Sequence, residues 1–454
     1  MHTQDTIAAI ATAPGTAAIA VIRLSGPASL EIADRLFRCA APPPSRRPGG
    51  TFVYGKVLGS EGILDECLLL IFRAPKSYTR EEVVEIQCHG GQESARRILR
   101  RVLECGARSA EPGEFTRRAF LNGRLDLVQA EAVMDLIGAQ SARAASSAVE
   151  QLAGRLSETM RGIYDRVIHA AADLEATLDF PEEDFPDDLA LQSMQAVRNT
   201  VDALDELLAT WEEGHRLREG ALVVISGRPN AGKSTLLNRL LGRERAIVSP
   251  VPGTTRDILE ETFVLNGLPI RLVDTAGLRE TGCAIEKEGI ARAQACIEKA
   301  DIRLHLVDAS IPFSTTDLAS IRESKPKQTF VLMNKTDLCS VVNASKYDGY
   351  EILTMSLKDG TGLQALHTAL ANALDRHPQR APHATISERH FQLLFQARSA
   401  LSSALDLEET ISGEGLVPAA AHLREAAELL GRLTGRTYYN DMLDQIFSRF
   451  CIGK

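Results

Sequence analysis

One eight-residue stretch limits what this chain can fold into more than any other. It runs Gly227-Arg228-Pro229-Asn230-Ala231-Gly232-Lys233-Ser234 and fits the phosphate-loop pattern G-x-x-x-x-G-K-[ST]. The apolar run 221–226 before it predicts a buried strand, and 235–241 after it predicts a helix. Glycines let backbone N–H groups turn toward phosphates, and a helix N-terminus adds partial positive charge. An ordinary glycine turn is the alternative, but this context favours a nucleotide site.

The motif also predicts the roles of individual residues in this loop. Lys233 is expected to reach the β- and γ-phosphates, and Ser234 is expected to bind Mg²⁺. The rest of the predicted phosphate cradle consists of four loop and helix residues: Asn230, Ala231, Gly232 and Thr235.

Two segments farther along the chain fit the γ-phosphate side of such a site. Asp274 follows the apolar run 270–273 and suits a second Mg²⁺ contact, and the backbone of Gly277 can meet the γ-phosphate. Thr255 is a candidate for sensing the γ-phosphate through Mg²⁺. The other residues predicted to contact the nucleotide in these two segments are Ser249, Pro250, Val251, Pro252, Gly253, Thr254, Thr275 and Ala276.

A third group of residues predicts which base is bound. Asn334-Lys335-Thr336-Asp337 follows the apolar run 330–333, and Ser356-Leu357-Lys358 follows 351–355. The carboxylate of Asp337 can accept hydrogen bonds from N1–H and the 2-amino group of guanine, a donor pair that adenine lacks. These motifs in this order resemble a Ras-like GTPase domain.

One position departs from Ras-type switches. Those proteins have a Gln directly after the D-x-x-G motif, which orients the attacking water. This chain has Leu278 there, whose side chain cannot form a hydrogen bond. Water activation must therefore come from another group, or hydrolysis must be very slow.

The composition is that of a globular protein with several domains. The 454 residues suggest about two to four domains. A net charge of -9 argues against a broadly basic nucleic-acid coat. Eight cysteines without a C-x-x-C pair are expected to be reduced and mostly buried, as in a cytoplasmic protein. The apolar segment 7–22 is broken by Pro14-Gly15 and is interpreted as two short strands, not as a signal or membrane span.

The pattern of apolar residues divides the chain into three parts. Residues 1–121 predict an α/β domain, 122–217 and 377–454 a helical domain, and 218–376 an α/β GTPase domain inserted into it. Two separate helical domains are the alternative. The predicted N-terminal strands are 17–24, 51–58, 63–72 and 83–88, and the predicted helices outside the GTPase domain include 30–37, 93–104, 388–407, 417–433 and 438–450. Residues 42–50 and 179–188 predict loops.

The predicted helix 93–104 carries four arginines, Arg96, Arg97, Arg100 and Arg101. A solvated helix face is the favoured interpretation, and an anion or RNA patch is the alternative.

Both ends of the chain resemble one family. Six segments carry this resemblance: Asp5–Ala9, Val21–Gly26, Glu85–Gly91, Glu111–Thr116, Ala119–Leu127 and the terminal Cys451–Lys454. Together they are similar to the bacterial tRNA-modification GTPases of the MnmE (TrmE) family, over essentially the whole chain.

The resemblance implies an enzyme that works with a flavoprotein partner, MnmG (GidA). The two install an aminomethyl or carboxymethylaminomethyl group on C5 of the wobble uridine of certain tRNAs. The one-carbon unit would come from 5-formyl- or 5,10-methylene-tetrahydrofolate bound by the N-terminal domain. The family is a homodimer through these N-terminal domains, and its GTPase domains pair when GTP and K⁺ bind.

The resemblance also implies site residues for hydrolysis. It makes Asn230 a K⁺ ligand together with Ser249, Val251 and Thr254, although Asn230 could instead only stabilise the loop turn. A K⁺ ion there supplies positive charge where other GTPases use an arginine. Glu286 matches the family's catalytic Glu, although the residues alone leave Glu280 and Glu288 as equal candidates. Arg279 is a further candidate for ordering the switch.

The implied folate contacts are Arg23, Glu81, Arg124 and Lys454, with Cys451 nearby. Cationic side chains suit the carboxylates of the folate glutamate tail, and Glu81 can pair with pterin amino groups. Glu82 is adjacent, so this assignment could slip by one residue. A catalytic role for the Cys451 thiol is a hypothesis, and an exposed thiol without function is the alternative.

Two other functional classes compete with this interpretation. A ribosome-assembly GTPase of the Era or Der kind would carry a KH domain or a second phosphate loop, and the sequence has neither. A folate enzyme regulated by its GTPase domain differs only in which site acts on the methylene group.

Overall fold

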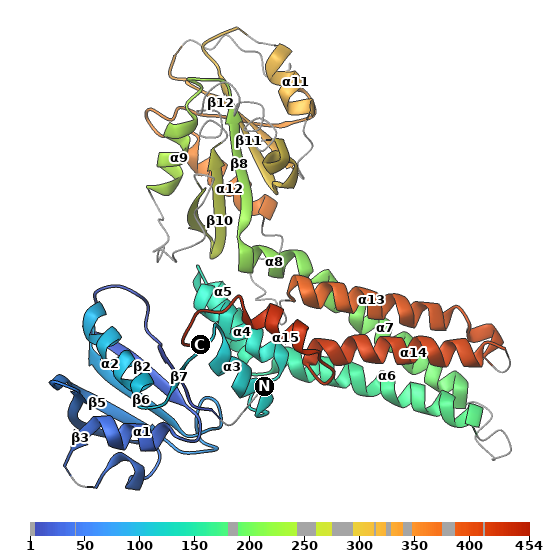
Figure 1. Ribbon diagram of the computed structural model, residues 1–454. Helices are drawn as coiled ribbons and strands as arrows, with labels where there is room; N and C mark the ends of the chain where they lie inside the picture. Colours follow the sequence, from blue (N-terminus) through green and yellow to red (C-terminus); the bar gives the residue numbers. More distant parts are fainter. Residues whose placement is uncertain are drawn as a thin grey trace, which may run out of the picture. The chain divides into compact units, whose positions relative to one another are not determined.

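The computed structural model describes most of the chain, in ten segments. These are residues 5–40, 42–179, 189–242, 260–274, 294–312, 315–323, 328–338, 347–374, 386–411 and 414–454. The chain forms two compact units. Figure 1 shows the helices and strands that make up both. The first contains residues 1–134, 157–197 and 403–454, and the second contains 135–156 and 198–402.

A seven-stranded sheet forms the base of the first unit. Its strand order is β3-β4-β5-β6-β2-β1-β7, and all neighbouring pairs are antiparallel except β1 with β7. The strands are β1 (Ile7–Ile10), β2 (Ile19–Ser25), β3 (Phe37–Cys39), β4 (Thr51–Gly59), β5 (Gly62–Phe72), β6 (Val83–His89) and β7 (Arg108–Ser109). Segment 7–22 thus supplies two paired strands, as expected from its broken apolar pattern.

Helices α1 (Ser29–Leu36) and α2 (Gln92–Glu104) cover one face of this sheet. Both are amphipathic, since Ile32 and Leu36 of α1 and Ile98 and Val102 of α2 are buried in the sheet core. The opposite face of α2 carries the arginines. Arg96, Arg97 and Arg100 are exposed, and Arg101 binds Glu104 and the carbonyl oxygen of Leu58.

The helices outside the GTPase region come both before and after it in the sequence. Those before it are α3 (Glu114–Leu121), α4 (Leu127–Gly138), α5 (Ala142–Leu152), α6 (Arg155–Asp179), α7 (Leu189–Ala209) and α8 (Trp211–Glu219), and those after it are α13 (Glu388–Leu405), α14 (Leu416–Thr434) and α15 (Asn440–Phe447). Within the first unit, α6 and α14 are linked by the ion pair of Glu175 with Arg424. Within the second, the rings of Trp211 and Phe391 stack at 5.1 Å.

A six-stranded sheet organises the second unit. Its order is β13-β12-β11-β8-β10-β9, and every pair is parallel except β10 with β9. The strands are β8 (Ala221–Gly227), β9 (Glu260–Leu265), β10 (Leu268–Asp274), β11 (Ile302–Asp308), β12 (Gln328–Asn334) and β13 (Glu351–Thr354). The central strands β8, β11 and β12 are buried over most of their length, as expected for a parallel sheet covered on both faces, although β11 also buries Arg303 and His305. Their carboxyl ends therefore meet at one edge, where ligands of such sheets bind.

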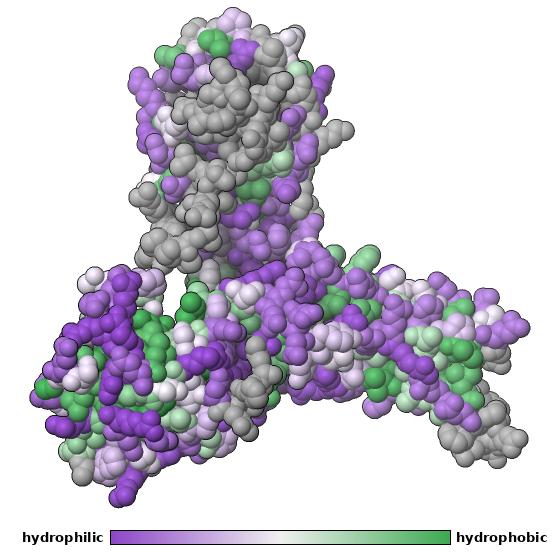
Figure 2. All heavy atoms as spheres, viewed as in Figure 1, coloured by the Kyte–Doolittle hydropathy of each residue, from purple (hydrophilic) through white to green (hydrophobic). Residues whose placement is uncertain are grey.

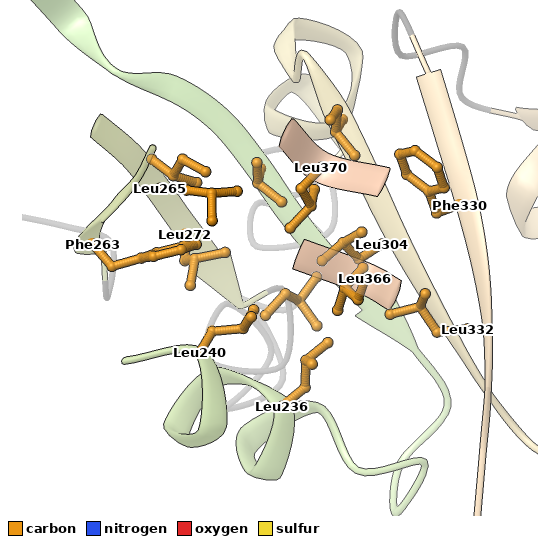
Figure 3. Packing of buried hydrophobic residues seen from close by; sticks show 14 of the residues in the cluster. Leu236, Leu240, Phe263, Leu265, Leu272, Leu304, Phe330, Leu332, Leu366 and Leu370 are labelled. Carbon is orange, nitrogen blue, oxygen red and sulfur yellow. The ribbon is translucent and has the colours of Figure 1, made fainter. Parts of the chain in front are cut away.

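Leucines from two helices fill the core on one face of this sheet (Figure 3). Leu236 and Leu240 come from α9 (Lys233–Leu241), and Leu366 and Leu370 come from α12 (Leu363–Leu374). They pack on strand residues such as Leu304. On the other face, Ile321 of α11 (Thr315–Glu323) packs with Val331 and Met333 of β12.

The predicted N-terminal strands and the helices after the GTPase domain are confirmed to within a few residues, and the differences have local causes. The helix expected over 30–37 ends at Leu36, since Phe37 pairs with Val57 in β3. The helix expected over 438–450 is shorter, Asn440–Phe447. The predicted loop 42–50 contains a 3₁₀ turn at Pro44–Arg46. Asp179, expected in a loop, ends α6, and the rest of that acidic segment lies outside the described residues.

The burial of the cysteines agrees only in part with what the sequence predicted. Among the described residues six cysteines are free, and three of these, Cys67, Cys88 and Cys105, are buried. The expectation of mostly buried thiols therefore holds for half of them.

None of the described helices combines the length and the apolar character that crossing a membrane requires.

Candidate functional site

The phosphate loop joins β8 to α9, as its sequence predicts. Gly227 has φ +142°, and a Cβ there would lie 2.4 Å from the carbonyl oxygen of Leu306. Gly232 has φ +107°, and a Cβ there would lie 2.5 Å from Nδ2 of Asn334. Both positions therefore require glycine, because a side chain would meet backbone or a buried amide. The loop thus has the bare backbone that a phosphate cradle needs.

Lys233 opens α9 and points back into its own loop. Its Nζ donates hydrogen bonds to the carbonyl oxygens of Gly227 at 3.1 Å and Arg228 at 2.9 Å. The ammonium group therefore lies against the backbone at the start of the phosphate loop, and the residue is buried. Asn230 has φ +64°, a left-handed conformation that Asn tolerates better than most residues. Asn230, Ser234 and Thr235 are exposed, and Ala231 is buried.

The predicted base-binding residues come together at the ends of β12 and β13. The side chain of Asn334 donates to the carbonyl oxygen of Ala231 at 2.8 Å and accepts from the amide of Leu357 at 3.1 Å. Ser356 donates to Asp337 at 3.0 Å, and Lys358 lies 4.0 Å from the other oxygen of Asp337. One buried amide thus ties the phosphate loop to the segment predicted to stack on the base.

Lys335 has a partner that the sequence argument missed. Its Nζ lies 2.6 Å from Oδ2 of Asp308, at the end of β11. Burial favours the neutral form of Asp308, but hydrogen bonds from Lys335 and Ser310 outweigh it and lower the pKa of this carboxyl. The sequence contains a pattern that could have indicated Asp308 as a site residue. Asp308 ends a mostly buried strand, just as Asp274 and Asn334 do.

The γ-phosphate side of the site is only partly described. Asp274 ends β10 beside Ile225 of β8 and is buried. The other residues predicted for this side lie outside the described residues: Ser249, Pro250, Val251, Pro252, Gly253, Thr254, Thr255, Thr275, Ala276, Gly277, Arg279 and Glu286. Leu278 lies outside them as well.

A second cluster of the predicted site residues lies in the first unit, where the end of the chain meets β1 and β2. Gly453 has φ +98°, and a Cβ there would lie 2.5 Å from the carbonyl oxygen of Ile10. Arg23 donates to the carbonyl oxygen of Gly453 at 3.3 Å and pairs with Glu85 at 2.8 Å. Burial, and then the neighbouring cation of Arg23, lowers the pKa of Lys454. Two cationic side chains are therefore held close together.

Tyr78 links Arg23 to the third cation of this cluster. The guanidinium of Arg23 lies 5.3 Å from the centre of the Tyr78 ring, and that of Arg124 lies 4.7 Å from it. Arg124 also donates to the carbonyl oxygen of Tyr78 at 2.7 Å. Tyr78, Arg124 and Arg80 line a cavity of about 500 Å³. No local pattern marks Tyr78, because its role depends on Arg23 and Arg124, which are far from it in the chain.

Glu81 is fixed by other partners. It accepts from Ser25 at 2.6 Å and from Arg118 at 3.3 Å. Arg118 is buried and also binds Asp5 and Glu114. The four predicted folate residues are therefore placed by neighbouring parts of β2, the 78–81 segment, the chain after α3 and the C-terminus. Cys451 is exposed, and its carbonyl oxygen accepts from the amide of Lys454 at 3.3 Å.

Known proteins match this chain over its whole length. Residues 6–124 match the N-terminus of GTP-binding protein TrmE, and residues 127–451 match the MnmE helical domain. The tRNA modification GTPase MnmE of Geotalea uraniireducens is 43% identical over 464 residues and covers 100% of both chains. That of Geobacillus thermodenitrificans is 41% identical over 99% of both chains. This chain belongs to the MnmE family of tRNA modification GTPases.

The MnmE architecture accounts for the order of the elements. The match to the MnmE helical domain spans residues 127–451, and the six-stranded sheet lies within this range. The GTPase domain is therefore inserted into the helical domain. This single match favours one interrupted helical domain over the alternative of two separate helical domains. As a MnmE-family member, the protein is a GTP-hydrolysing enzyme of tRNA modification. The glycine-lined loop has the bare backbone that nucleotide phosphates require.

A solved structure is also similar to the GTPase part. The G domain of the T. maritima FeoB iron transporter is 28% identical, covers 34% of this chain and 98% of its own, and has a TM-score of 0.27.

Proposed function

We propose that this protein is a K⁺-activated GTPase that adds an aminomethyl or carboxymethylaminomethyl group to C5 of the wobble uridine of certain tRNAs. It does so with a flavoprotein partner and a folate one-carbon unit. The observation that carries the proposal is the presence in one chain of a glycine-lined nucleotide loop and a separate cluster of three cations, in which Arg23 and Arg124 lie over the ring of Tyr78 and Lys454 lies near Arg23.

The nucleotide is GTP with Mg²⁺, bound by Ser234 and Thr255. Asp337 reads the base, because its carboxylate is held by Ser356 with one oxygen still able to accept. Asn230 supports the proposed K⁺ site, since it lies exposed on the loop that contains Lys233. Ser249, Val251 and Thr254 complete that site, and Glu286 positions the attacking water with help from Arg279.

The folate is bound in the first unit. Arg23, Arg124 and Lys454 attract the carboxylates of its glutamate tail, and the aromatic ring of Tyr78 gives it an apolar surface. Bound folate supplies the one-carbon unit. Glu81 pairs with the pterin, although two of its acceptor positions already hold Ser25 and Arg118. The exposed thiol of Cys451 lies on the same C-terminal turn as Lys454.

A homodimer is supported by apolar side chains on the open face of the N-terminal sheet. Phe52 and Tyr54 of β4 are 70% and 60% exposed, and Leu68 of β5, which pairs with Tyr54, is 37% exposed. Figure 2 shows hydrophobic residues among the hydrophilic surface of this unit. Adjacent exposed apolar residues on a sheet mark an association surface. The assembly with the flavoprotein is then a heterotetramer or larger, in the cytoplasm.

The first experiment measures GTP turnover in K⁺ and in Na⁺ at matched ionic strength, for the wild type and Asn230→Ala. The expected result is a large loss of turnover in Na⁺ and in the variant. Equal turnover in both salts would overturn K⁺ activation.

A second experiment separates the folate site from the GTPase. Binding of 5-formyl-tetrahydrofolate is measured by calorimetry for the wild type, Lys454→Met and Arg398→Met. Lys454→Met is expected to weaken binding, whereas the control removes an arginine that pairs with Asp205 in the second unit. Equal folate affinity in all three proteins would remove Lys454 from the site.

A further inference from the structure

A buried polar cluster lies where strand β8 passes into the phosphate loop. Its members are Ser226, the residue before Gly227, and Arg303 and His305 on the neighbouring strand β11. Arg303 and His305 are each 1% exposed, and Ser226 is 4% exposed. An arginine buried to this extent in a sheet is unusual and requires hydrogen bonds.

The three side chains form one directed chain of hydrogen bonds. Nε of Arg303 donates to Oγ of Ser226 at 2.8 Å, and Oγ of Ser226 lies 3.0 Å from Nδ1 of His305. Nη2 of Arg303 also lies 3.4 Å from Nδ1 of His305. Because a guanidinium can only donate, Nδ1 of His305 must be an acceptor, and the proton of the neutral ring is on Nε2.

The surroundings keep His305 neutral. Burial, and then the cations of Arg303 and Lys233, lowers the pKa of His305 to about 3. A positive imidazole would carry a proton on Nδ1 and lose its role as acceptor. In the part of the chain that the structure describes, Nε2 has no hydrogen-bond partner. Within the described residues, the hydrogen bonds that orient the ring are those at Nδ1.

This chain of hydrogen bonds fixes the point at which the strand becomes the loop. Ser226 and Gly227 of β8 lie opposite His305 and Leu306 of β11. The bare Cα of Gly227 already allows β11 to approach closely, and the carbonyl oxygen of Gly227 accepts from Lys233 at 3.1 Å. A shift of Ser226 would therefore move the carbonyl that positions the ammonium group of Lys233.

We propose that Arg303 and His305 are positioning residues for nucleotide binding, which act through Ser226 on the entrance of the phosphate loop and on Lys233. They do not touch the nucleotide themselves. The phosphate loop was predicted from its own motif. The hydrogen bonds that hold Ser226 come from β11, and neither Arg303 nor His305 belongs to a nucleotide-binding motif.

The test measures Kd for fluorescent GTP and GDP analogues, together with kcat and KM, for Ser226→Ala, Arg303→Met and the double variant. Each single change is expected to raise both Kd values about tenfold, because a buried donor or acceptor loses its partner. The factor should be similar for GTP and GDP, and KM should change more than kcat. The double variant should be no weaker than the worse single variant, because both break the same chain.

Arg271→Met is the matched control. Arg271 is a strand arginine of β10 that lies opposite Leu222, at the other end of β8 from the loop. It should leave both Kd values unchanged. Unchanged nucleotide affinity in Ser226→Ala and Arg303→Met, with a lower melting temperature, would show that the cluster only stabilises the fold and would overturn the proposal.

A further variant covers the case in which Arg303→Met does not fold. His305→Phe keeps a planar aromatic ring at this position but removes the acceptor for Ser226 and Arg303. It is expected to raise Kd about threefold, because one of the three hydrogen bonds remains. A Kd equal to that of the wild type would overturn the proposal for His305.

Discussion

The side-chain amide of Asn334 donates a hydrogen bond to the backbone carbonyl of Ala231 across 2.8 Å. Its oxygen accepts from the amide of Leu357 at 3.1 Å. Asn334 is 3% exposed, so neither bond is shared with bulk water. A single side chain therefore couples the phosphate loop to the segment predicted to contact the base.

Replacing Asn334 by Ala should weaken GTP and GDP binding together. The change leaves a buried carbonyl and a buried amide without partners, which costs about 1–3 kcal/mol for each group. We expect a loss of affinity of at least about tenfold, measured by titration with fluorescent guanine nucleotides. Thr368→Ala is the control, because Thr368 is exposed and its hydroxyl donates to the carbonyl oxygen of Gln364 within its own helix. Unchanged affinity in Asn334→Ala would contradict the coupling.

Changing Asp337 to Asn should alter which base is bound. In the proposed site the carboxylate of Asp337 would accept from the two donors of guanine, whereas an amide presents one donor and one acceptor. A base with a carbonyl in place of the 2-amino group, such as xanthine, then becomes the better partner. Competition binding of GTP and XTP should show the preference reversed. Retained preference for GTP would mean that Asp337 does not read the base.

Changing Glu114 to Gln should destabilise the first unit in a pH-dependent way. Burial favours the neutral form of Glu114, but hydrogen bonds from Arg108, the amide of Glu111 and Arg118 outweigh it and lower its pKa below the ordinary 4.5. A lowered pKa means that the carboxylate stabilises the fold above the pKa of the unfolded chain, and that this contribution is lost as the pH falls through the folded pKa.

We therefore expect Glu114→Gln to lower the free energy of unfolding by about 2 kcal/mol at pH 7. The difference from the wild type should shrink as the pH falls below about 4. Denaturant unfolding of both proteins between pH 7 and pH 3 measures this. A difference that stays constant across this range would contradict an ionic origin.

Changing Gly453 to Ala should displace the C-terminal turn. Its φ of +98° and the carbonyl oxygen of Ile10, 2.5 Å from a Cβ, both disfavour a side chain. Lys454 would then move away from Arg23, and folate affinity should fall about tenfold or more while GTP affinity stays unchanged. Gly138→Ala is the control, because a Cβ at Gly138 meets nothing within 4 Å. Normal folate binding in Gly453→Ala would contradict the proposed site.

Local patterns in the sequence determined the elements and the nucleotide loop. Gly227, Gly232 and Lys233 are recognisable because their chemistry depends on close neighbours in the chain, and the strand and helix around them follow from apolar periodicity. The polar residues at the ends of β10 and β12 were predicted for the same reason, since the carboxyl ends of parallel strands share one edge.

Only the tertiary structure decided which distant residues support these sites. The contacts of Asp308 with Lys335, of Arg303 and His305 with Ser226, and of Tyr78 with Arg23 and Arg124 are pairings across strands or between segments distant in the sequence. No local pattern specifies them, because their burial and hydrogen bonds arise only when separate segments pack together.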